Sequence, residues 1–253
     1  MKPMNEMSVL ITGGGSGIGE GTARYFARHG AHVTICGRRE DKLRAVAESI
    51  GPLCHHEVAD ITDDADCARV VAAAVAHGGG LDALINNAGN MLRGPITGMT
   101  RADLLGVFDS NVVAGMILTG LAVPHLEARK GAVIFMGSVH TRRSYPGAAP
   151  YAATKGAVEV LAKVLAAELG PKGIRVNCVI PGAVSTELNI RAGIISAEDQ
   201  VARMKALESS HALGRIGTEE ELAEGIAHMC CAQWTTGAAL VVDGGLALGI
   251  SNL

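Results

Sequence analysis

Short apolar runs alternate with longer amphipathic stretches along almost the whole chain. The runs are rich in Val, Ile, Leu and Ala, and the stretches between them repeat apolar residues at helical spacing. The predicted strands cover residues 9–12, 32–36, 53–58, 81–85, 131–136, 174–179 and 240–242. The predicted helices cover residues 17–29, 40–50, 63–77, 101–127, 151–169 and 219–230. This alternation predicts an α/β fold, a doubly wound parallel sheet of seven strands flanked by helices on both faces.

The pattern runs through all 253 residues without a repeat, a linker or a break in composition, so we expect one domain over residues 1–253. Residues 185–217 are the one long stretch without a predicted strand, and we expect approximately this segment to form a lid over the site. Met204 and Leu207 lie about one turn apart there and could cover a bound molecule, although such a stripe is more often simple packing.

Charge and cysteine usage narrow the possible partners. A net charge of −3 disfavours a nucleic-acid partner, and the six cysteines show no metal-ligand spacing. The first residues lack the apolar stretch of a signal peptide, and no apolar run reaches the roughly 20 residues of a membrane span. We therefore expect a cytoplasmic protein with no metal and no membrane partner.

A glycine-rich loop joins the first predicted strand to the first predicted helix. Glycines let the backbone approach a phosphate closely, and the unpaired N–H groups of the helix N-terminus attract the anion. A loop of this kind after a strand is typical of a Rossmann-type fold, although the loop alone could be a structural turn. The loop residues expected to bind a dinucleotide are Gly13, Gly15, Ser16, Gly17, Ile18 and Gly19.

Two arginines indicate which dinucleotide is bound. Arg38 and Arg39 follow the second predicted strand, at the point that meets the adenosine ribose in dinucleotide-binding folds. An acidic residue there would bind the ribose hydroxyl of NAD, whereas arginine pairs with the 2′-phosphate of NADP. The sequence therefore favours NADP(H) over NAD(H), and the alternative is a solvated arginine pair at a helix start.

Four polar residues form a candidate catalytic set. Tyr151 and Lys155 lie one helical turn apart and face the same way, Ser138 follows the fifth predicted strand, and Asn111 lies on the long helix. Hydride reduction of a carbonyl needs a proton donor at the oxygen, and a tyrosine serves if nearby positive charge stabilises its phenolate. Each residue alone has an ordinary structural explanation, but coincidence is a poor account of the four together.

With these motifs the chain resembles the short-chain dehydrogenase/reductase family, in its compact single-domain branch, over essentially its whole length. The resemblance implies Tyr151 as general acid/base, Ser138 as substrate-orienting donor, and Lys155 as ribose anchor and modulator of the tyrosine pKa. It also implies that Asn111 holds a water that relays protons from Lys155. Further cofactor contacts that the resemblance implies come from Asp60, Ile61, Asn87, Ala88, Gly89, Pro181, Gly182, Val184 and Thr186, besides Tyr151 and Lys155.

The segment between Ser138 and Tyr151 must border the reacting centre. His140 and Tyr145 could hydrogen-bond a polar substrate, and Met91 could add an apolar wall. Arg142 and Arg143 could meet a carboxylate, but two arginines capping a loop in solvent are more common.

The leading hypothesis is an NADP-dependent oxidoreductase that interconverts a small, possibly cyclic, ketone and a secondary alcohol. One alternative is a 3-oxoacyl-carrier-protein reductase, for which Arg129, Lys130 and Lys172 could meet an acidic carrier. A nicotinamide-binding sensor without catalysis is a further alternative. The long predicted helix is apolar on several sides, which indicates a partner helix, and the resemblance implies a homotetramer.

Overall fold

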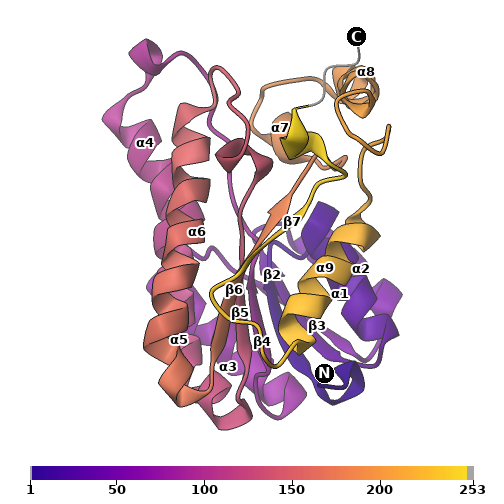
Figure 1. The fold of residues 1–253 in the computed structure, drawn as a ribbon. Coiled ribbons are helices and arrows are strands. Elements are labelled where there is room, and N and C mark those ends of the chain that lie inside the picture. Colours follow the sequence, from indigo (N-terminus) through magenta and orange to yellow (C-terminus); the bar gives the residue numbers. More distant parts are fainter. Residues whose placement is uncertain (1, 250–253) are drawn as a thin grey trace.

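The apolar runs form one parallel sheet in the computed structural model, which describes residues 2–249 (Figure 1). Its seven strands lie in the order β3-β2-β1-β4-β5-β6-β7. The strands are β1 (Ser8–Thr12), β2 (His32–Gly37), β3 (Cys54–Val58), β4 (Ala83–Asn86), β5 (Ala132–Met136), β6 (Arg175–Pro181) and β7 (Ala239–Val242). The predicted Rossmann-type sheet of seven strands is confirmed.

The helices cover both faces of this sheet. Helices α1, α2 and α9 pack on one face, whereas α3, α5 and α6 pack on the other (Figure 1). The helices are α1 (Gly17–Arg28), α2 (Glu40–Ile50), α3 (Asp64–Gly78), α4 (Arg101–Phe108), α5 (Ala114–Arg129), α6 (Ala149–Leu169), α7 (Leu188–Arg191), α8 (Ala197–Glu208) and α9 (Glu219–Cys231). Short 3-10 turns occupy Met4–Glu6, Ile96–Gly98, Val139–Thr141, Gly170–Lys172 and Leu246–Leu248.

Successive side chains of the central strands serve two separate cores. In β5, Ile134 and Met136 join the core under α1, α2 and α9, while Val133 and Phe135 join the core under α3, α5 and α6. A strand that is buried on both faces must be apolar at every position, which is why these strands read as continuous apolar runs. Burial of both faces fixes the register of the sheet.

The order of the strands places the site. The chain moves outward from β1 to β2 and β3, then returns to β4 on the other side of β1. Helices that leave β1 and β4 therefore diverge, and a crevice opens beyond the carboxyl ends of these two strands.

The predicted helix over 101–127 is one continuous helix from Arg101 to Arg129 with a π-helical turn at Asp109–Val113. By length and composition alone it is apolar enough to cross a membrane, which the sequence analysis did not expect. Core helices of soluble proteins pass the same test. Its exposed apolar side chains include Leu105, Val113, Met116, Ile117 and Leu121.

The predicted lid segment carries two helices of its own. Helices α7 and α8 lie between β6 and α9, and a parallel bridge pairs Val184 with Gly217 across the base of the segment. Gln200 of α8 is buried and donates from Nε2 to the Thr186 carbonyl at 3.2 Å. These contacts hold the segment beside the carboxyl ends of the strands.

Candidate active site

The glycine loop is tied directly to the end of β4. The Thr12 hydroxyl accepts hydrogen bonds from the backbone N–H groups of Asn87 at 3.0 Å and Ala88 at 2.9 Å. The Asn87 amide donates to the Thr12 carbonyl at 2.8 Å. The two strand ends on either side of the crevice are therefore one hydrogen-bonded unit.

Glycine is required in this loop for two different reasons. Gly13 and Gly17 have φ angles of +68° and +57°, a region that other residues rarely adopt. Gly19 lies on α1, and a Cβ there would stand 2.3 Å from the Gly13 carbonyl oxygen. The helix thus approaches the loop more closely than any side chain permits, and its N-terminal N–H groups face the crevice.

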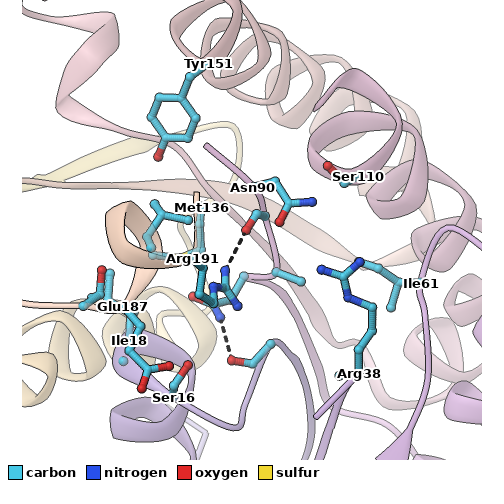
Figure 2. A pocket seen from close by; sticks show the side chains of 18 of the residues that line it. Ser16, Ile18, Arg38, Ile61, Asn90, Ser110, Met136, Tyr151, Glu187 and Arg191 are labelled. Atoms are coloured by element: carbon cyan, nitrogen blue, oxygen red, sulfur yellow. Dashed lines mark hydrogen bonds between the residues drawn. The ribbon is translucent and has the colours of Figure 1, made fainter. Parts of the chain in front are cut away.

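A cleft runs from this loop to the candidate catalytic residues. Figure 2 shows Tyr151 at one end and Arg38 and Ser16 toward the other. The predicted cofactor residues that line the cleft are Gly13, Ser16, Gly17, Ile18, Arg38, Asp60, Ile61, Asn87, Ala88, Gly89, Tyr151, Lys155, Pro181 and Thr186. The predicted cofactor residues outside its lining are Gly15, Gly19, Arg39, Gly182 and Val184.

Two of these outlying residues act on the shape of the cleft. Arg39 forms an ion pair with Glu187 at 2.6 Å and donates to the Ser16 hydroxyl at 2.7 Å, so it joins the glycine loop to the lid. A Cβ at Gly182 would lie 2.7 Å from the Asp243 Cα, so glycine there permits close backbone packing.

Arg38 lies at the far end of the cleft. It is largely exposed and pairs with Asp60 at 3.7 Å. Desolvation opposes ionisation of Asp60, but hydrogen bonds from Thr62 and the charge of Arg38 prevail and lower the pKa of its carboxyl. An ionised Asp60 and the Arg38 guanidinium, which pairs with it, therefore lie at the same end of the cleft.

Tyr151 and Lys155 come from α6 and are both buried at the other end. Burial raises the pKa of the Tyr151 phenol to about 12, and a hydrogen bond with Ser138 works against this rise. Burial lowers the pKa of Lys155 to about 8. The Lys155 Nζ donates to the Met136 carbonyl at 2.8 Å and lies 5.6 Å from the centre of the Tyr151 ring.

Ser138 and His140 lie beside Tyr151, although neither they nor Tyr145 line the cleft itself. The Ser138 hydroxyl lies 3.0 Å from the His140 Nδ1. The His140 ring stands edge-on to Tyr151, with centroids 5.1 Å apart, and packs against Tyr145 at 4.5 Å. The structure thus brings together four of the predicted catalytic and substrate residues: Ser138, His140, Tyr145 and Tyr151.

Asn111 has a different set of contacts. It lies in the π-helical turn, and its amide Nδ2 donates to the Asn90 carbonyl at 2.9 Å and to the Thr154 hydroxyl at 3.0 Å. Its Oδ1 accepts from the Asn90 N–H at 2.7 Å. Asn111 therefore holds the segment after β4 against α6.

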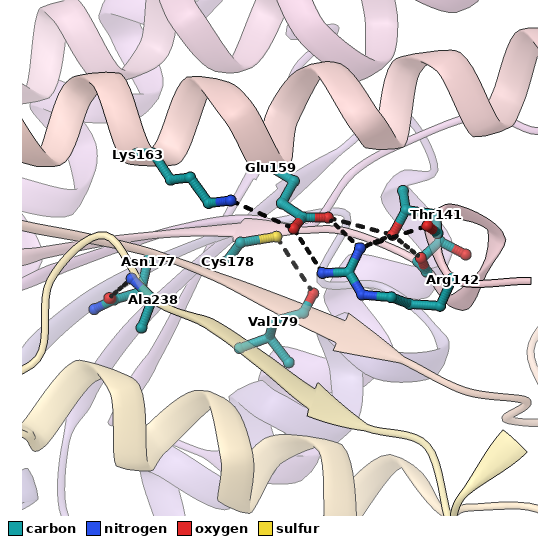
Figure 3. A network of polar contacts seen from close by, with 9 residues as sticks. Thr141, Arg142, Glu159, Lys163, Asn177, Cys178, Val179 and Ala238 are labelled. Atoms are coloured by element: carbon teal, nitrogen blue, oxygen red, sulfur yellow. Dashed lines mark hydrogen bonds and ion pairs between the residues drawn. The ribbon is translucent and has the colours of Figure 1, made fainter. Parts of the chain in front are cut away.

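The remaining predicted pocket residues differ in where they point. Arg142 forms a two-point ion pair with Glu159 (Figure 3). Arg143 donates to the Leu246 carbonyl at 3.3 Å. Met91 is half-buried and does not line the cleft.

Several charged residues near the cleft escaped the sequence analysis. Arg191 and Glu187 line the cleft from the lid, and Arg191 donates to the Gly89 carbonyl at 3.2 Å (Figure 2). Arg93 and Arg203 act on His140 and lower its pKa, after burial, which is the largest cause. Their positions in the sequence could have indicated Arg93 and Arg203, because Arg93 lies two residues after the predicted wall residue Met91 and Arg203 directly precedes Met204.

The cleft fits a nicotinamide dinucleotide. Its glycine loop leads into a helix N-terminus, whose N–H groups suit a phosphate. Its far end has Arg38, and its near end has the buried Lys155 and Tyr151. The residues that would hold the dinucleotide therefore occur in the order that the ligand requires.

Comparison with known proteins agrees with this geometry. A family profile described as enoyl-(acyl carrier protein) reductase matches residues 13–247. Glucose 1-dehydrogenase of Gluconobacter oxydans is 38% identical over 95% of this chain and 91% of its own length. L-fucose dehydrogenase of Bos taurus is 35% identical over 95% and 89%. A 3-oxoacyl-[acyl-carrier-protein] reductase of Chlamydia muridarum is 32% identical over 95% and 97%.

Solved structures show the same fold. A short-chain dehydrogenase/reductase of Caenorhabditis elegans, crystallised with cofactor, superimposes with a TM-score of 0.90 at 28% identity over 97% of this chain and 96% of its own. A 3-ketoacyl-(acyl-carrier-protein) reductase of Brucella melitensis, complexed with NADH, gives 0.88 at 32% identity over 96% and 99%. The chain belongs to the short-chain dehydrogenase/reductase family and is an NAD(P)-dependent oxidoreductase that acts on CH–OH groups.

Proposed function

We propose that this enzyme uses NADP(H) to interconvert a small ketone, cyclic or open-chain, and the corresponding secondary alcohol. The observation that carries the proposal is a buried pair, Tyr151 and Lys155, that lines one end of the glycine-lined cleft, with the buried Ser138 hydrogen-bonded to Tyr151. A bound nicotinamide cofactor supplies the hydride to the carbonyl carbon. Every proton in the reaction is then handled by the chain itself.

In the reducing direction, Tyr151 donates its phenolic proton to the carbonyl oxygen. Ser138 lies beside the phenol and orients the same oxygen by hydrogen bonding. With a pKa near 12, the phenol is a weak acid in the protein alone, so positive charge in the cleft must stabilise the phenolate. The Lys155 ammonium, 5.6 Å from the ring, supplies part of that charge.

Asn111 supports this centre as a positioning residue. Its side chain fixes the Asn90 backbone and Thr154, which lies one residue before Lys155. We propose that a water held beside Asn111 returns protons through Lys155 to Tyr151.

The preference for NADP rests on the arginines around the far end of the cleft. Arg38 lines the cleft and is largely exposed, and Arg39 donates a hydrogen bond to the Ser16 hydroxyl. Burial is the largest cause that lowers the pKa of Arg191, and the positive charges of Arg39 and Arg38 lower it further. Such crowding of positive charge favours the additional phosphate of NADP. Replacing Gly37→Asp together with Arg38→Ile should shift the preference toward NAD.

Reduction of a 3-oxoacyl group on a carrier protein is the second candidate, because two relatives named for that activity match 95% and 96% of this chain. The three basic residues considered for docking of a carrier protein already have partners within the chain. Arg129 donates to the Gly79 carbonyl at 2.6 Å, Lys130 donates to the Lys172 carbonyl at 3.1 Å, and Lys172 pairs with Glu127 at 3.4 Å. This occupation favours the small ketone.

We also propose a homotetramer in the cytoplasm. The exposed apolar side chains of α5 (Met116, Ile117, Leu121) and of α6 (Val160, Val164) support burial against another copy. All six cysteines are free thiols, which suits a reducing compartment. Light scattering that gives a monomer mass would contradict the assembly.

The deciding experiment follows the consumption of NADPH and of NADH with cyclic ketones, diketones and an acetoacetyl thioester. Turnover with NADPH that is lost about 100- to 10,000-fold in Tyr151→Phe, with cofactor affinity retained, supports the proposal. Faster turnover of the thioester would favour the carrier-protein reductase. Turnover that survives in Tyr151→Phe would remove that residue as the acid.

A further inference from the structure

The His140 ring is held in one orientation beside Tyr151. Its Nδ1 lies 3.0 Å from the Ser138 hydroxyl, and its backbone N–H donates to the same oxygen at 3.3 Å. The ring stands edge-on to Tyr151 with centroids 5.1 Å apart, and the Tyr145 ring packs on it at 4.5 Å. Aromatic rings on two sides and a hydrogen bond at Nδ1 fix the imidazole, so its two nitrogens have different surroundings.

The Ser138 hydroxyl decides which of the two nitrogens carries the proton. A serine hydroxyl has one hydrogen to donate and two lone pairs that accept. The backbone N–H of His140 fills one of these lone pairs. If Nδ1 lacked a proton, the single serine hydrogen would point to the imidazole. Ser138 would then have no donor left for Tyr151 or for the oxygen of a carbonyl substrate.

Ser138 does act as a donor toward Tyr151. Their hydrogen bond lowers the pKa of the phenol, which is the effect of a donor that stabilises the phenolate. The Nδ1 of His140 must therefore carry a proton and donate to the second lone pair of the serine. Burial, followed by nearby positive charges, lowers the pKa of His140 to about 4, so the ring carries only that proton. The Nε2 is left as an unprotonated acceptor.

The Nε2 of His140 is open to a ligand. His140 is half-buried, and no hydrogen bond within residues 2–249 involves its Nε2. In this part of the chain, the enclosed side-chain atoms that lack a partner belong to Asn86, Gln200 and His211. An enclosed Nε2 without a partner would be one more, so the His140 Nε2 is accessible. His140 does not line the cofactor cleft, so a bound dinucleotide leaves this nitrogen to the substrate.

Resting on the proposed function, we propose that the substrate is an α-hydroxy ketone or the corresponding vicinal diol, and that the His140 Nε2 accepts a hydrogen bond from the hydroxyl beside the reacting carbon. The reacting oxygen lies on Ser138 and Tyr151. Because Nδ1 contacts the Ser138 hydroxyl directly, Nε2 of the same ring borders the neighbouring carbon of a bound ketone. The carbonyl carbon gains the hydride of NADPH and its oxygen gains the Tyr151 proton, whereas the neighbouring hydroxyl only binds and is unchanged.

The first test reads the tautomer of His140 and needs no turnover. Long-range proton–nitrogen NMR spectra are recorded on the isotope-labelled enzyme saturated with NADP near neutral pH. The His140 signals are identified by their loss in His140→Asn. We expect a protonated Nδ1 and an unprotonated Nε2, whose resonance shifts on addition of acetoin but not of butanone. A proton on Nε2, or an Nε2 that responds to both ketones alike or to neither, overturns the proposal.

The second test separates a donor from an acceptor on the substrate. Acetoin and 2-hydroxycyclohexanone are each compared with their methyl ether and with the parent ketone. The ether keeps the electron-withdrawing oxygen but cannot donate, and the parent ketone controls for bulk. We expect kcat/KM for the hydroxy ketone to exceed both by about 10- to 100-fold, because an unpaired acceptor disfavours the other two. Equal kcat/KM for the hydroxy ketone and its ether overturns the proposal.

Two variants divide the contacts of His140 between its nitrogens. His140→Phe removes both, whereas the amide of His140→Asn can still donate to Ser138 but places nothing at Nε2. Both variants should lose the advantage of the hydroxy ketone, and kcat for the parent ketone should be lower in His140→Phe. His228→Asn, an exposed position on α9, is the matched control and should keep the advantage. An advantage that persists in His140→Phe overturns the proposal.

The two tests distinguish this proposal from the proposed function. Silence toward every ketone would contradict the proposed function, and the tautomer and the response of the Nε2 resonance would still decide the role of His140. Turnover of plain ketones without any preference for a neighbouring hydroxyl would support the proposed function and overturn this proposal.

Discussion

Arg142 and Glu159 join the loop that carries Ser138 to the helix that carries Tyr151 and Lys155. The Arg142 Nη1 and Nη2 donate to the two carboxylate oxygens of Glu159 at 2.9 and 2.6 Å (Figure 3). Glu159 is buried and lies one turn beyond Lys155. Because a two-point pair fixes both distance and angle, it sets how Ser138 faces Tyr151.

Replacing Glu159→Gln should therefore disturb catalysis through geometry. We expect a loss of about 2 kcal/mol in the free energy of unfolding, since the buried Glu159 side chain loses its charge-assisted hydrogen bonds with Arg142. We also expect kcat to fall about tenfold, with little change in the affinity for the cofactor. Lys163→Met is the control, because Lys163 is exposed and lies 3.9 Å from the same carboxylate. A Glu159→Gln enzyme with normal kcat would show that the pair serves stability alone.

His140 should stay neutral throughout the physiological pH range. Burial, followed by the charges of Arg93, Arg203 and Lys155, lowers its pKa to about 4. The pKa of His140 in the folded protein lies below the unfolded value of 6.5. The free energy of unfolding therefore decreases as pH falls from 6.5 toward 4. We expect no histidine inflection in kcat/KM between about pH 5 and 8. An inflection near 6.5 that disappears in His140→Ala would contradict this assignment.

Lys155 makes the stability of the protein depend on pH in the alkaline range. Burial lowers its pKa from 10.5 to about 8, so the charged form is disfavoured in the folded protein. The charged lysine therefore lowers the free energy of unfolding at neutral pH, and this penalty disappears as pH rises from about 8 to 10.5. Lys155→Met should raise the free energy of unfolding near pH 7 by an amount on the order of 3 kcal/mol, and the difference should shrink as pH rises.

Denaturant unfolding of the wild type and Lys155→Met at several pH values checks this expectation. Comparing the two proteins at each pH cancels the contribution of the Cys36 thiol, whose pKa is raised by burial. Cys178 is coupled to Lys155, so its titration also contributes to the difference between the two proteins at alkaline pH. A difference that does not depend on pH would mean that packing, and not charge, limits the stability of the site.

Gly19 should tolerate no side chain. A Cβ there would meet the Gly13 carbonyl at 2.3 Å and the Asn87 amide at 2.6 Å, both parts of the rigid unit between β1 and β4. Gly19→Ala should cost about 1 to 3 kcal/mol of stability and weaken cofactor binding, measured by quenching of protein fluorescence or by calorimetry. Gly156→Ala in α6 is the control, because a Cβ there meets nothing within 4 Å and should stabilise the helix by about 0.5 to 1 kcal/mol. Normal cofactor affinity in Gly19→Ala would show that the loop can move.

The order of strands and helices along the chain was determined by the sequence, because the strands are short, mostly apolar runs and the helices repeat apolar residues at helical spacing. The glycine loop and the spacing of Tyr151 and Lys155 are local features, so the printed residues were enough to place them. The helix from Arg101 to Arg129 was predicted over 101–127, but its length and apolar composition, which would suit a membrane span, were not expected.

Only the tertiary structure decided which charged residues face the site. Arg142 and Arg143 lie next to the reacting centre in sequence but are turned away by Glu159 and the Leu246 carbonyl, whereas Arg93 and Arg203 arrive from distant segments. The pKa values of Tyr151, Lys155 and His140 likewise depend on burial, which no local pattern specifies. Secondary structure follows from periodic local contacts, but the electric field in a cleft is a sum over residues that only folding brings together.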